Sequence, residues 1–96
     1  MTNVIFEVVD KSGRKIRLTL TQWEHMMRRH SYMEKYLEEI KETLITPDKL
    51  IRFYNKVYYY KYYKHLKAPN RFVLVVVKYL NGDGFVITSY LEEKIK

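Results

Sequence analysis

The apolar run from Phe72 to Val77 limits the possible folds more strongly than any other segment of the chain. A strand with one wet face alternates apolar and polar residues, whereas a run that is apolar at every position indicates a strand covered on both faces. Its four valines also favour extended backbone. The run therefore predicts that residues 71–80 form a central strand of a sheet.

The tripeptide Thr46-Pro47-Asp48 separates helical from extended patterns, because proline and the residue before it disfavour a helix. Before Pro47, residues 4–9 and 15–20 flank a glycine-bearing turn and predict a β-hairpin. Helical spacing then predicts a short helix at 22–29 and an amphipathic helix that ends near Leu44. After Pro47, alternation and turn residues predict four strands, at residues 49–54, 57–64, 71–80 and 85–90.

Two sequences of the capping-box type mark the predicted helix starts. In this motif a Ser or Thr hydroxyl and a Glu carboxylate three residues later accept hydrogen bonds from free amides of the first turn. Thr21 with Glu24 predicts the start of the first helix, and Ser31 with Glu34 predicts the start of the second.

The expected fold class is α+β, in one domain at residues 1–96. A chain of 96 residues with 47% hydrophobic residues is large enough for a single modest core. Short connections between the later strands predict an antiparallel meander with both helices packed on one face. We therefore expect an N-terminal β-hairpin, two helices and then a four-stranded antiparallel sheet.

Basic residues concentrate after Pro47. The formal net charge is +7, and residues 48–96 hold 10 of the 18 basic residues but only 4 of the 11 acidic ones. From Lys49 to Arg71 there are seven basic residues and no Asp or Glu. A field of one sign attracts polyanions such as nucleic acids or anionic membrane surfaces.

The segment Tyr54–Lys64 adds six of the ten tyrosines to this basic region. Cations suit phosphates and aromatic rings suit bases, so the segment indicates contact with RNA or single-stranded DNA. Tyrosine is also common in strands, and packing alone explains the pattern equally well. Alternation predicts one face with Tyr58, Tyr60, Tyr62 and Lys64, and an opposite face with Val57, Tyr59, Lys61 and Tyr63.

Several classes of chemistry lack the residues they need. The absence of cysteine excludes disulfides, zinc–cysteine sites and thiol nucleophiles. The acidic residues fall at predicted turns, caps and solvated helix faces, which argues against a carboxylate-held metal. No glycine-rich phosphate loop or serine-esterase elbow is present. The sequence has neither a membrane-spanning run nor a signal peptide, so we expect a cytoplasmic protein that binds no membrane. We also expect that the protein needs no cofactor.

RNA cleavage needs no metal, because the 2′-hydroxyl of RNA can attack the adjacent phosphorus while the protein supplies a base, an acid and cations. The side chains that suit these roles come from the first helix and from the strands: His25, Arg29, His30, Arg52, Lys61, Thr88, Ser89 and Tyr90. Each also has a simpler structural explanation. A histidine on a short helix is more often a surface or packing residue, and an arginine near a helix C-terminus stabilises the helix dipole.

The same residues carry a family resemblance that spans nearly the whole chain. It rests on the motif Trp23-x-His25-x-x-x-Arg29-His30, the helix end at Thr46-Pro47-Asp48, the tyrosine-rich and valine-rich strands and the closing Val86–Tyr90 segment. In these features the chain resembles the phage-associated barnase-EndoU-colicin-RelE-like nucleases. Members of this superfamily combine helices with a four-stranded antiparallel sheet. They act as metal-independent ribonucleases, often as toxins or in conflicts that involve phages and mobile elements.

The resemblance implies roles for the candidate residues. The catalytic residues would be His30, His25, Arg52, Lys61 and Thr88. The residues that bind the substrate would be Tyr60, Tyr62, Lys64, Arg29 and Tyr90. His30, or alternatively His25, would be the general base or acid, and the strand cations would hold the phosphate. Because alternation separates Lys61 from Tyr60, both can face one cleft only if a bulge intervenes.

Two other functions fit the same sequence. A relative without catalytic activity would bind RNA or single-stranded DNA through the Tyr/Lys strand, with an affinity that falls with salt. A protein-interaction module would present exposed tyrosines to a partner, such as an antitoxin or a second copy, because Tyr is common in interface centres. The sequence therefore leaves three testable functions for the same surface.

Overall fold

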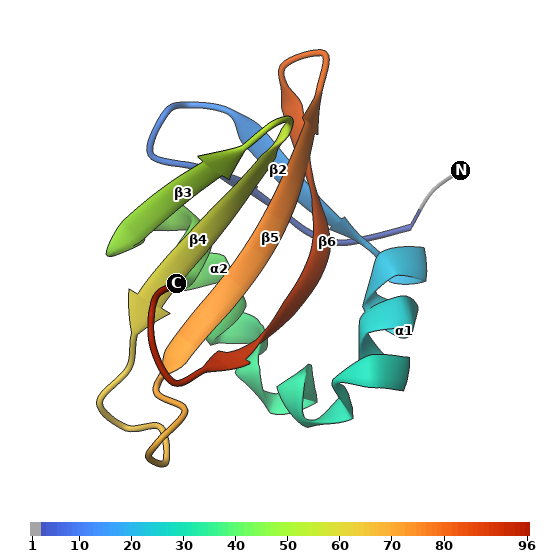
Figure 1. Ribbon diagram of the computed structural model, residues 1–96. Helices are drawn as coiled ribbons and strands as arrows, with labels where there is room; N and C mark the ends of the chain where they lie inside the picture. Colours follow the sequence, from blue (N-terminus) through green and yellow to red (C-terminus); the bar gives the residue numbers. More distant parts are fainter. Residues whose placement is uncertain (1–2) are drawn as a thin grey trace.

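The computed structural model describes residues 3–96, which form one six-stranded sheet and two α-helices (Figure 1). In chain order the elements are β1 (Val4–Val9), β2 (Lys15–Thr19), α1 (Leu20–Arg29), the 3-10 helix η1 (Ser31–Tyr36), α2 (Leu37–Ile45), β3 (Lys49–Phe53), β4 (Lys56–Tyr62), β5 (Phe72–Leu80) and β6 (Asp83–Glu92). All six predicted strands are present, with small shifts at their ends. Neither α-helix in the described chain is long and apolar enough to cross a membrane.

The predicted four-stranded antiparallel sheet is wrong, because the hairpin joins the meander in a single mixed sheet with strand order β1-β2-β6-β5-β4-β3. β2 pairs with β6 in parallel, through Ile16 with Gly84 and Arg17 with Phe85. All other neighbouring strands are antiparallel. The physical reason is that β6 would otherwise end the sheet with unpaired backbone groups. The hairpin supplies partners for β6 at Gly84 and Phe85, and Ile16 and Leu18 of β2 are completely buried. The α+β class itself is confirmed.

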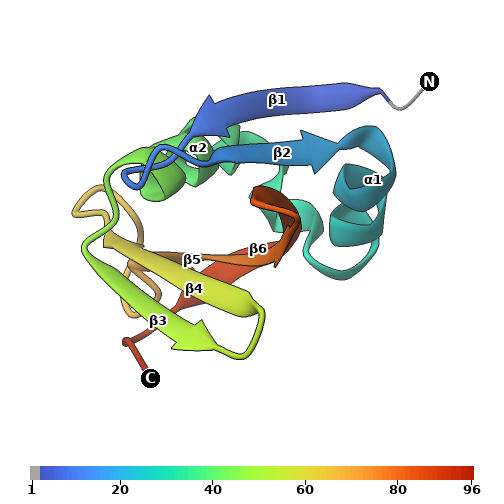
Figure 2. The ribbon, with the colours of Figure 1, turned by 90° about the horizontal axis from the view of Figure 1, so that it is seen from above.

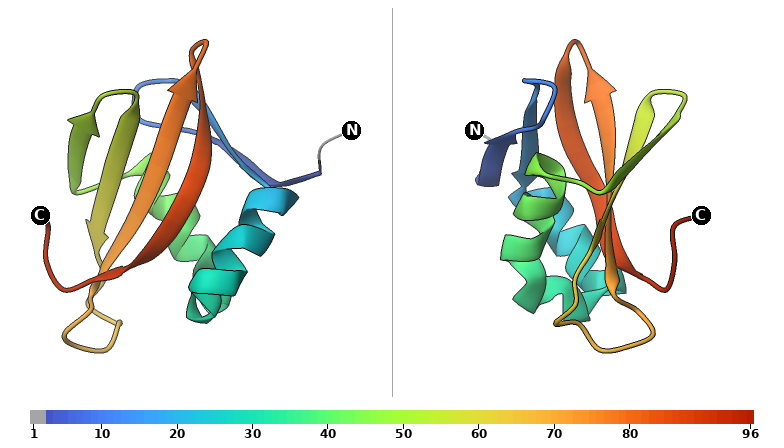
Figure 3. Two further views of the ribbon diagram at one scale, coloured as in Figure 1. Left: turned by 45° about the vertical axis from the view of Figure 1, so that its right-hand side comes forward. Right: turned by 90° about the vertical axis from the view of Figure 1, so that its left-hand side faces the viewer.

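Both helices lie on one side of a curled sheet (Figures 2 and 3). α2 contacts β1, β4 and β5. Ile40 and Leu44 of α2 pack in the main hydrophobic core with Val73, Val75 and Val77 of β5. The amphipathic pattern of this helix therefore directs its apolar face to the sheet.

β5 is the buried central strand that its apolar run predicts, with β4 and β6 as neighbours. Toward the helices, Val73, Val75 and Val77 are fully buried. On the opposite face, Leu74 and Val76 are also buried. They pack with side chains of neighbouring strands and of the C-terminal segment: Ile51, Tyr58, Tyr60, Ile87, Tyr90 and Ile95. We call this second side the open sheet face, because no helix of residues 3–96 covers it (Figure 3).

Both predicted helix caps are wrong. The hydroxyl that caps α1 belongs to Thr19, not Thr21, and it accepts a hydrogen bond from the Gln22 amide at 3.2 Å. Thr19 is the last residue of β2, and its extended backbone is the conformation that an N-cap requires. Thr19 and Gln22 also match the capping-box spacing. Ser31 begins the 3-10 helix η1 without a side-chain cap, and α2 follows from Leu37.

A buried carboxylate ties the hairpin turn to the sheet. Asp10 is 8% exposed, and one of its oxygens accepts hydrogen bonds from the Ser12 amide (2.9 Å), the Ser12 hydroxyl (2.6 Å) and the Arg14 amide (2.9 Å). The other oxygen accepts from the hydroxyls of Tyr59 on β4 (2.8 Å) and Tyr79 on β5 (2.9 Å). Five hydrogen bonds to one carboxylate therefore connect the turn with two central strands.

Gly84 lies where β2 and β6 pair, and the space around it is filled. A methyl group there would approach Val77 Cγ1 and Tyr79 Cε1 to 2.9 Å and Ile16 Cγ1 to 3.1 Å. All three neighbours are side-chain atoms of packed strands, so these side chains or their strands must shift to relieve the contacts. We expect Gly84→Ala to lower the free energy of unfolding by about 1–3 kcal/mol, measured by urea denaturation. An unchanged or higher value would contradict this packing.

Candidate active site between helix α1 and strand β6

Helix α1 continues the edge of the sheet where β2 ends. Among residues 3–96, β2 pairs with β6 only at Gly84 and Phe85, because the chain turns into α1 after Thr19. The side-chain amide of Gln22 then donates a hydrogen bond of 2.6 Å to the carbonyl of Ile87 on β6. This bond satisfies a carbonyl at the edge of the sheet and fixes α1 beside β6 (Figure 1).

A β-bulge in β6 shapes the surface next to α1. The pairing of β5 with β6 shifts between Val76 and Val77, which leaves Ile87 as the extra residue. Bulges redirect side chains and are frequent beside active sites. Beyond the bulge, Thr88 and Tyr90 pair with residues of the open sheet face and therefore lie on that face themselves.

A pocket of about 620 Å³ lies between α1 and β6. We call it the α1–β6 pocket, and its lining residues are Gln22, His25, Met26, Arg28, Arg29, His30, Ile87, Thr88 and Tyr90. The lining combines two imidazoles, two guanidinium groups and two hydroxyl groups, and no carboxylate of the described chain takes part. The structure thus brings together five residues predicted for the site: His25, Arg29, His30, Thr88 and Tyr90.

His30 occupies the junction between α1 and η1. Its backbone amide donates a 2.7 Å hydrogen bond to the Met26 carbonyl, which ends α1. Its imidazole stacks on Tyr90, with ring centroids 5.1 Å apart and 30° between the ring planes. Tyr32 meets the same imidazole edge-on at 5.9 Å. His30 is half-buried by these contacts, whereas His25 is exposed on the helix.

The remaining polar groups of the pocket are hydrogen-bond donors. Burial, and then the nearby Glu92 carboxylate, raise the pKa of the Tyr90 hydroxyl. The hydroxyl therefore stays protonated at neutral pH and can donate a hydrogen bond. Arg28 and Arg29 are exposed in the last turn of α1. Guanidinium groups bind phosphate in a bidentate manner, so the pocket suits a phosphate ligand.

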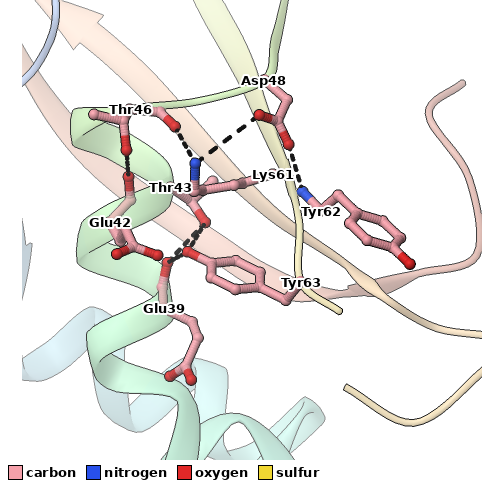
Figure 4. A network of polar contacts seen from close by, with 8 residues as sticks. All are labelled: Glu39, Glu42, Thr43, Thr46, Asp48, Lys61, Tyr62 and Tyr63. Carbon is pink, nitrogen blue, oxygen red and sulfur yellow. Dashed lines mark hydrogen bonds and ion pairs between the residues drawn. The ribbon is translucent and has the colours of Figure 1, made fainter. Parts of the chain in front are cut away.

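Arg52 and Lys61, the predicted phosphate-holding residues of the strands, do not line this pocket. Lys61 Nζ donates a 2.8 Å hydrogen bond to the Thr46 carbonyl at the end of α2 and lies 3.9 Å from a carboxylate oxygen of Asp48 (Figure 4). Arg52 lines a separate pocket of about 170 Å³ beside Asp10. Alternation directs both side chains to the helix side of the sheet, where Lys61 caps α2.

The two faces of β4 differ, as its alternation predicts. Tyr59 and Tyr63 project toward the helices: Tyr59 bonds to Asp10, and the Tyr63 hydroxyl donates a 3.0 Å hydrogen bond to the Glu39 carbonyl of α2 (Figure 4). Burial raises the pKa of both hydroxyls. Tyr59 therefore connects β4 to the hairpin turn, and Tyr63, directly after β4, connects the end of this strand to α2. Both side chains are buried.

Tyr60, Tyr62 and Lys64, the predicted substrate-binding residues of β4, also lie outside the α1–β6 pocket. Tyr60 is only 2% exposed and packs with Leu74 on the open sheet face. Tyr62 is 45% exposed and meets Phe72 edge-on at 5.5 Å. Lys64 is exposed in the loop after β4. The sequence-predicted residues thus divide into one group around α1 and β6 and another on β3 and β4.

Sequence reasoning missed Gln22, Met26, Arg28 and Ile87 as lining residues. The position of Arg28 near the end of the first helix is explained by the helix dipole alone, although the pair Arg28-Arg29 directly before His30 is a signal that could identify it. Gln22 and Ile87 gave no such signal, because their roles depend on the bulge and on the edge bond between distant segments.

Only the side chains that line the α1–β6 pocket indicate what chemistry the candidate active site can perform. Within residues 3–96, no group of three or more His, Cys, Asp or Glu side chains gathers as a metal site requires. Comparisons with protein-family models, with curated proteins and with solved structures found no match to this chain. The chemistry of the α1–β6 pocket is therefore the basis for a functional proposal.

Proposed function

We propose that the protein is a small metal-independent endoribonuclease whose active site is the α1–β6 pocket. The observation that carries the proposal is the gathering of two imidazoles and two guanidinium groups around one pocket of about 620 Å³. Histidine exchanges protons near neutral pH, and arginine binds phosphate oxygens. This combination suits attack of the RNA 2′-hydroxyl on its neighbouring phosphate.

In the proposed reaction, one imidazole removes the proton of a ribose 2′-hydroxyl, and the 2′-oxygen attacks the adjacent phosphorus. The bond from phosphorus to the 5′-oxygen of the next nucleotide breaks, and the other imidazole donates a proton to that oxygen. The products are a 2′,3′-cyclic phosphate and a 5′-hydroxyl. Arg28 and Arg29 stabilise the charge that develops on the phosphoryl oxygens, and the hydroxyl of Thr88 supplies a neutral hydrogen-bond donor.

His30 and His25 share the acid and base roles in this proposal. The stacking of His30 on Tyr90, at 5.1 Å between ring centroids, restricts the rotation of its imidazole. A positioned imidazole is more effective in proton transfer than a mobile one. We therefore assign Tyr90 as a positioning residue for His30.

We propose that this activity takes place in the cytoplasm, a compartment with which a cysteine-free chain is compatible. The family resemblance extends the proposal to a toxin restrained by an antitoxin or by a second copy.

Arg28→Ala and Arg29→Ala are each expected to weaken the binding of single-stranded RNA. For each lost phosphate contact, the slope of log affinity against log salt should become shallower by about 0.7. Fluorescence anisotropy with a 2′-O-methyl oligonucleotide, which cannot undergo 2′-hydroxyl attack, measures both quantities. Lys67→Ala is the matched control, because Lys67 is an exposed cation in the loop after β4. Equal weakening by Lys67→Ala would show that binding depends on net charge alone.

The alternative is an RNA- or single-stranded DNA-binding protein of the same fold without catalytic activity. The observation that favours it is the position of Arg52 and Lys61, which leaves the predicted strand cations outside the α1–β6 pocket. Such a protein would bind RNA without turnover and would not depend on its histidines.

Incubation of the purified protein with single-stranded RNA in EDTA decides between the proposed ribonuclease and the non-catalytic binding protein. The proposed enzyme cleaves the RNA and leaves DNA of the same sequence intact, because DNA has no 2′-hydroxyl. RNA binding without cleavage would favour the alternative. The absence of both binding and cleavage would contradict both.

A further inference from the structure

The open sheet face combines cations with aromatic rings next to the proposed active site. The pairing register places one lysine on this face from each of β3, β4 and β5, namely Lys49, Lys56 and Lys78. Lys56 and Lys78 are directly paired, and Tyr58 and Tyr60 follow Lys56 on the same face of β4, with Tyr60 paired to Lys49. A sheet face with exposed rings and basic residues is a common platform for single-stranded nucleic acids.

A second pocket, of about 340 Å³, opens on this face. We call it the sheet-face pocket, and its aromatic lining is Phe53 of β3, Tyr58 and Tyr60 of β4 and Tyr90 of β6. Tyr90 also lines the α1–β6 pocket, where His30 stacks on it. The two pockets therefore share Tyr90 as a lining residue.

Three of the four rings of the sheet-face pocket are at least partly exposed, and only the ring of Tyr60 is buried. Phe53 is 59% exposed, and Tyr58 is partly exposed. Lys96 and Glu92 also line the pocket, with an ion pair of 3.5 Å between them. The pocket thus presents aromatic surface, and its boundary contains a cation and an acceptor that could meet the polar edge of a base.

We infer that the sheet-face pocket binds the nucleobase of a nucleotide next to the phosphate in the α1–β6 pocket, and that the substrate is therefore single-stranded RNA. This inference rests on the proposed function. In a duplex, each base is paired and its faces are covered by its neighbours. An unpaired base, in contrast, can leave its stack and insert between side-chain rings.

Charge favours RNA over an apolar protein segment as the occupant. Among the described residues, Glu92 is the only acidic side chain that lines either pocket, and Lys96 neutralises it. Around the two pockets lie the three lysines of the open sheet face and the two arginines of α1. A regularly charged polyanion complements this surface, with its phosphates near the cations and its bases against the rings.

Binding of an uncleavable 2′-O-methyl oligonucleotide that carries one 2-aminopurine tests the inference. We compare the full chain with Phe53→Ala and Tyr58→Leu, which remove one ring each while leucine preserves apolar packing at position 58. Tyr54→Asn is the comparison variant, because Tyr54 is 92% exposed and does not line the pocket, although its ring meets that of Phe53 edge-on at 4.6 Å between centroids. Asparagine tolerates its backbone φ of 59°. Circular dichroism verifies that each variant is folded.

We expect each ring removal to reduce the affinity for the single strand about tenfold, since stacked bases contribute on this scale. The wild-type protein should quench 2-aminopurine fluorescence, Phe53→Ala and Tyr58→Leu should lessen that quenching, and Tyr54→Asn should change neither quantity. The hybridised duplex should bind more weakly than the single strand.

Three results would overturn the inference. If affinity depends on Arg28 and Arg29 but not on Phe53 and Tyr58, the base pocket is wrong while the proposed function stands. If the wild-type protein binds no oligonucleotide, the inference about the base pocket and the proposed function are both wrong. If the ring variants change the oligomeric mass in light scattering and leave RNA affinity intact, this face is an interface between copies of the chain.

Discussion

Replacement of both His25 and His30 by alanine is expected to lower the rate constant for RNA cleavage by about 10²- to 10⁴-fold, the usual contribution of general acid–base catalysis. Both imidazoles line the α1–β6 pocket. His25 is exposed and His30 only half-buried, so the fold should survive the substitutions. Single-turnover cleavage of an RNA oligonucleotide in EDTA, with enzyme in excess, measures the chemical step separately from product release.

His65→Ala is the matched control for this experiment. His65 is the third histidine of the chain, and its Nε2 atom lies 3.0 Å from Glu39 of α2, outside the α1–β6 pocket. Its replacement should leave cleavage unchanged. If cleavage survives the double replacement of His25 and His30 without loss, histidine is not the acid or base.

Asp10→Ala is expected to have the largest effect on stability, a loss of about 3–5 kcal/mol in the free energy of unfolding. The substitution removes the acceptor of five hydrogen bonds, two of them from hydroxyls of the central strands. The Tyr59 side chain is 2% exposed, so the loss of this acceptor leaves its hydroxyl with fewer hydrogen bonds in a buried position. Urea denaturation monitored by circular dichroism measures the loss.

The same carboxylate predicts how stability depends on pH. Burial, the largest single influence, raises the pKa of Asp10, but hydrogen bonds from Ser12, the Arg14 amide, Tyr59 and Tyr79 together outweigh it and lower the pKa. Because the folded pKa lies below that of the unfolded chain, the stabilisation is complete above about pH 4 and is lost as pH falls through the folded value. Asp10→Asn should weaken this acid dependence of the urea midpoint.

Glu7→Ala provides the comparison for the buried carboxylate. Glu7 is an exposed residue of β1 that pairs with Arg17 at 2.6 Å. Exposed pairs contribute little to stability, because water and salt screen them. We therefore expect Glu7→Ala to lower the free energy of unfolding much less than Asp10→Ala does. Similar losses for the two variants would contradict the special role of the Asp10 network.

Local patterns in the sequence predict the elements of this fold but not their assembly. The apolar run from Phe72 to Val77 and the alternation of the other strands follow from period-two geometry, so the strands were predicted closely. The parallel pairing of Ile16 with Gly84 joins distant segments through the tertiary structure. No turn or periodic signal marks such a pairing, and the prediction of a separate hairpin therefore failed.

The candidate site shows the same limit. His25, Arg29 and His30 belong to one short helix, so their proximity follows from local geometry. Their meeting with strand β6 depends on the bulge at Ile87 and on the Gln22 hydrogen bond. Lys61 lies outside the α1–β6 pocket, because it is on the face of β4 that the helices cover. Alternation separates the two faces of β4, but only the tertiary structure reveals which of them the helices cover.

Mass spectrometry of the RNA fragments released in EDTA bears most closely on the proposed enzyme. If the α1–β6 pocket catalyses attack by the 2′-hydroxyl, the upstream fragment carries a 2′,3′-cyclic phosphate and the downstream fragment a 5′-hydroxyl. A single 2′-O-methyl group at the cleavage position should prevent the reaction. Fragments with 5′-phosphate ends, cleavage that requires an added metal ion, or intact RNA after prolonged incubation would contradict the proposal.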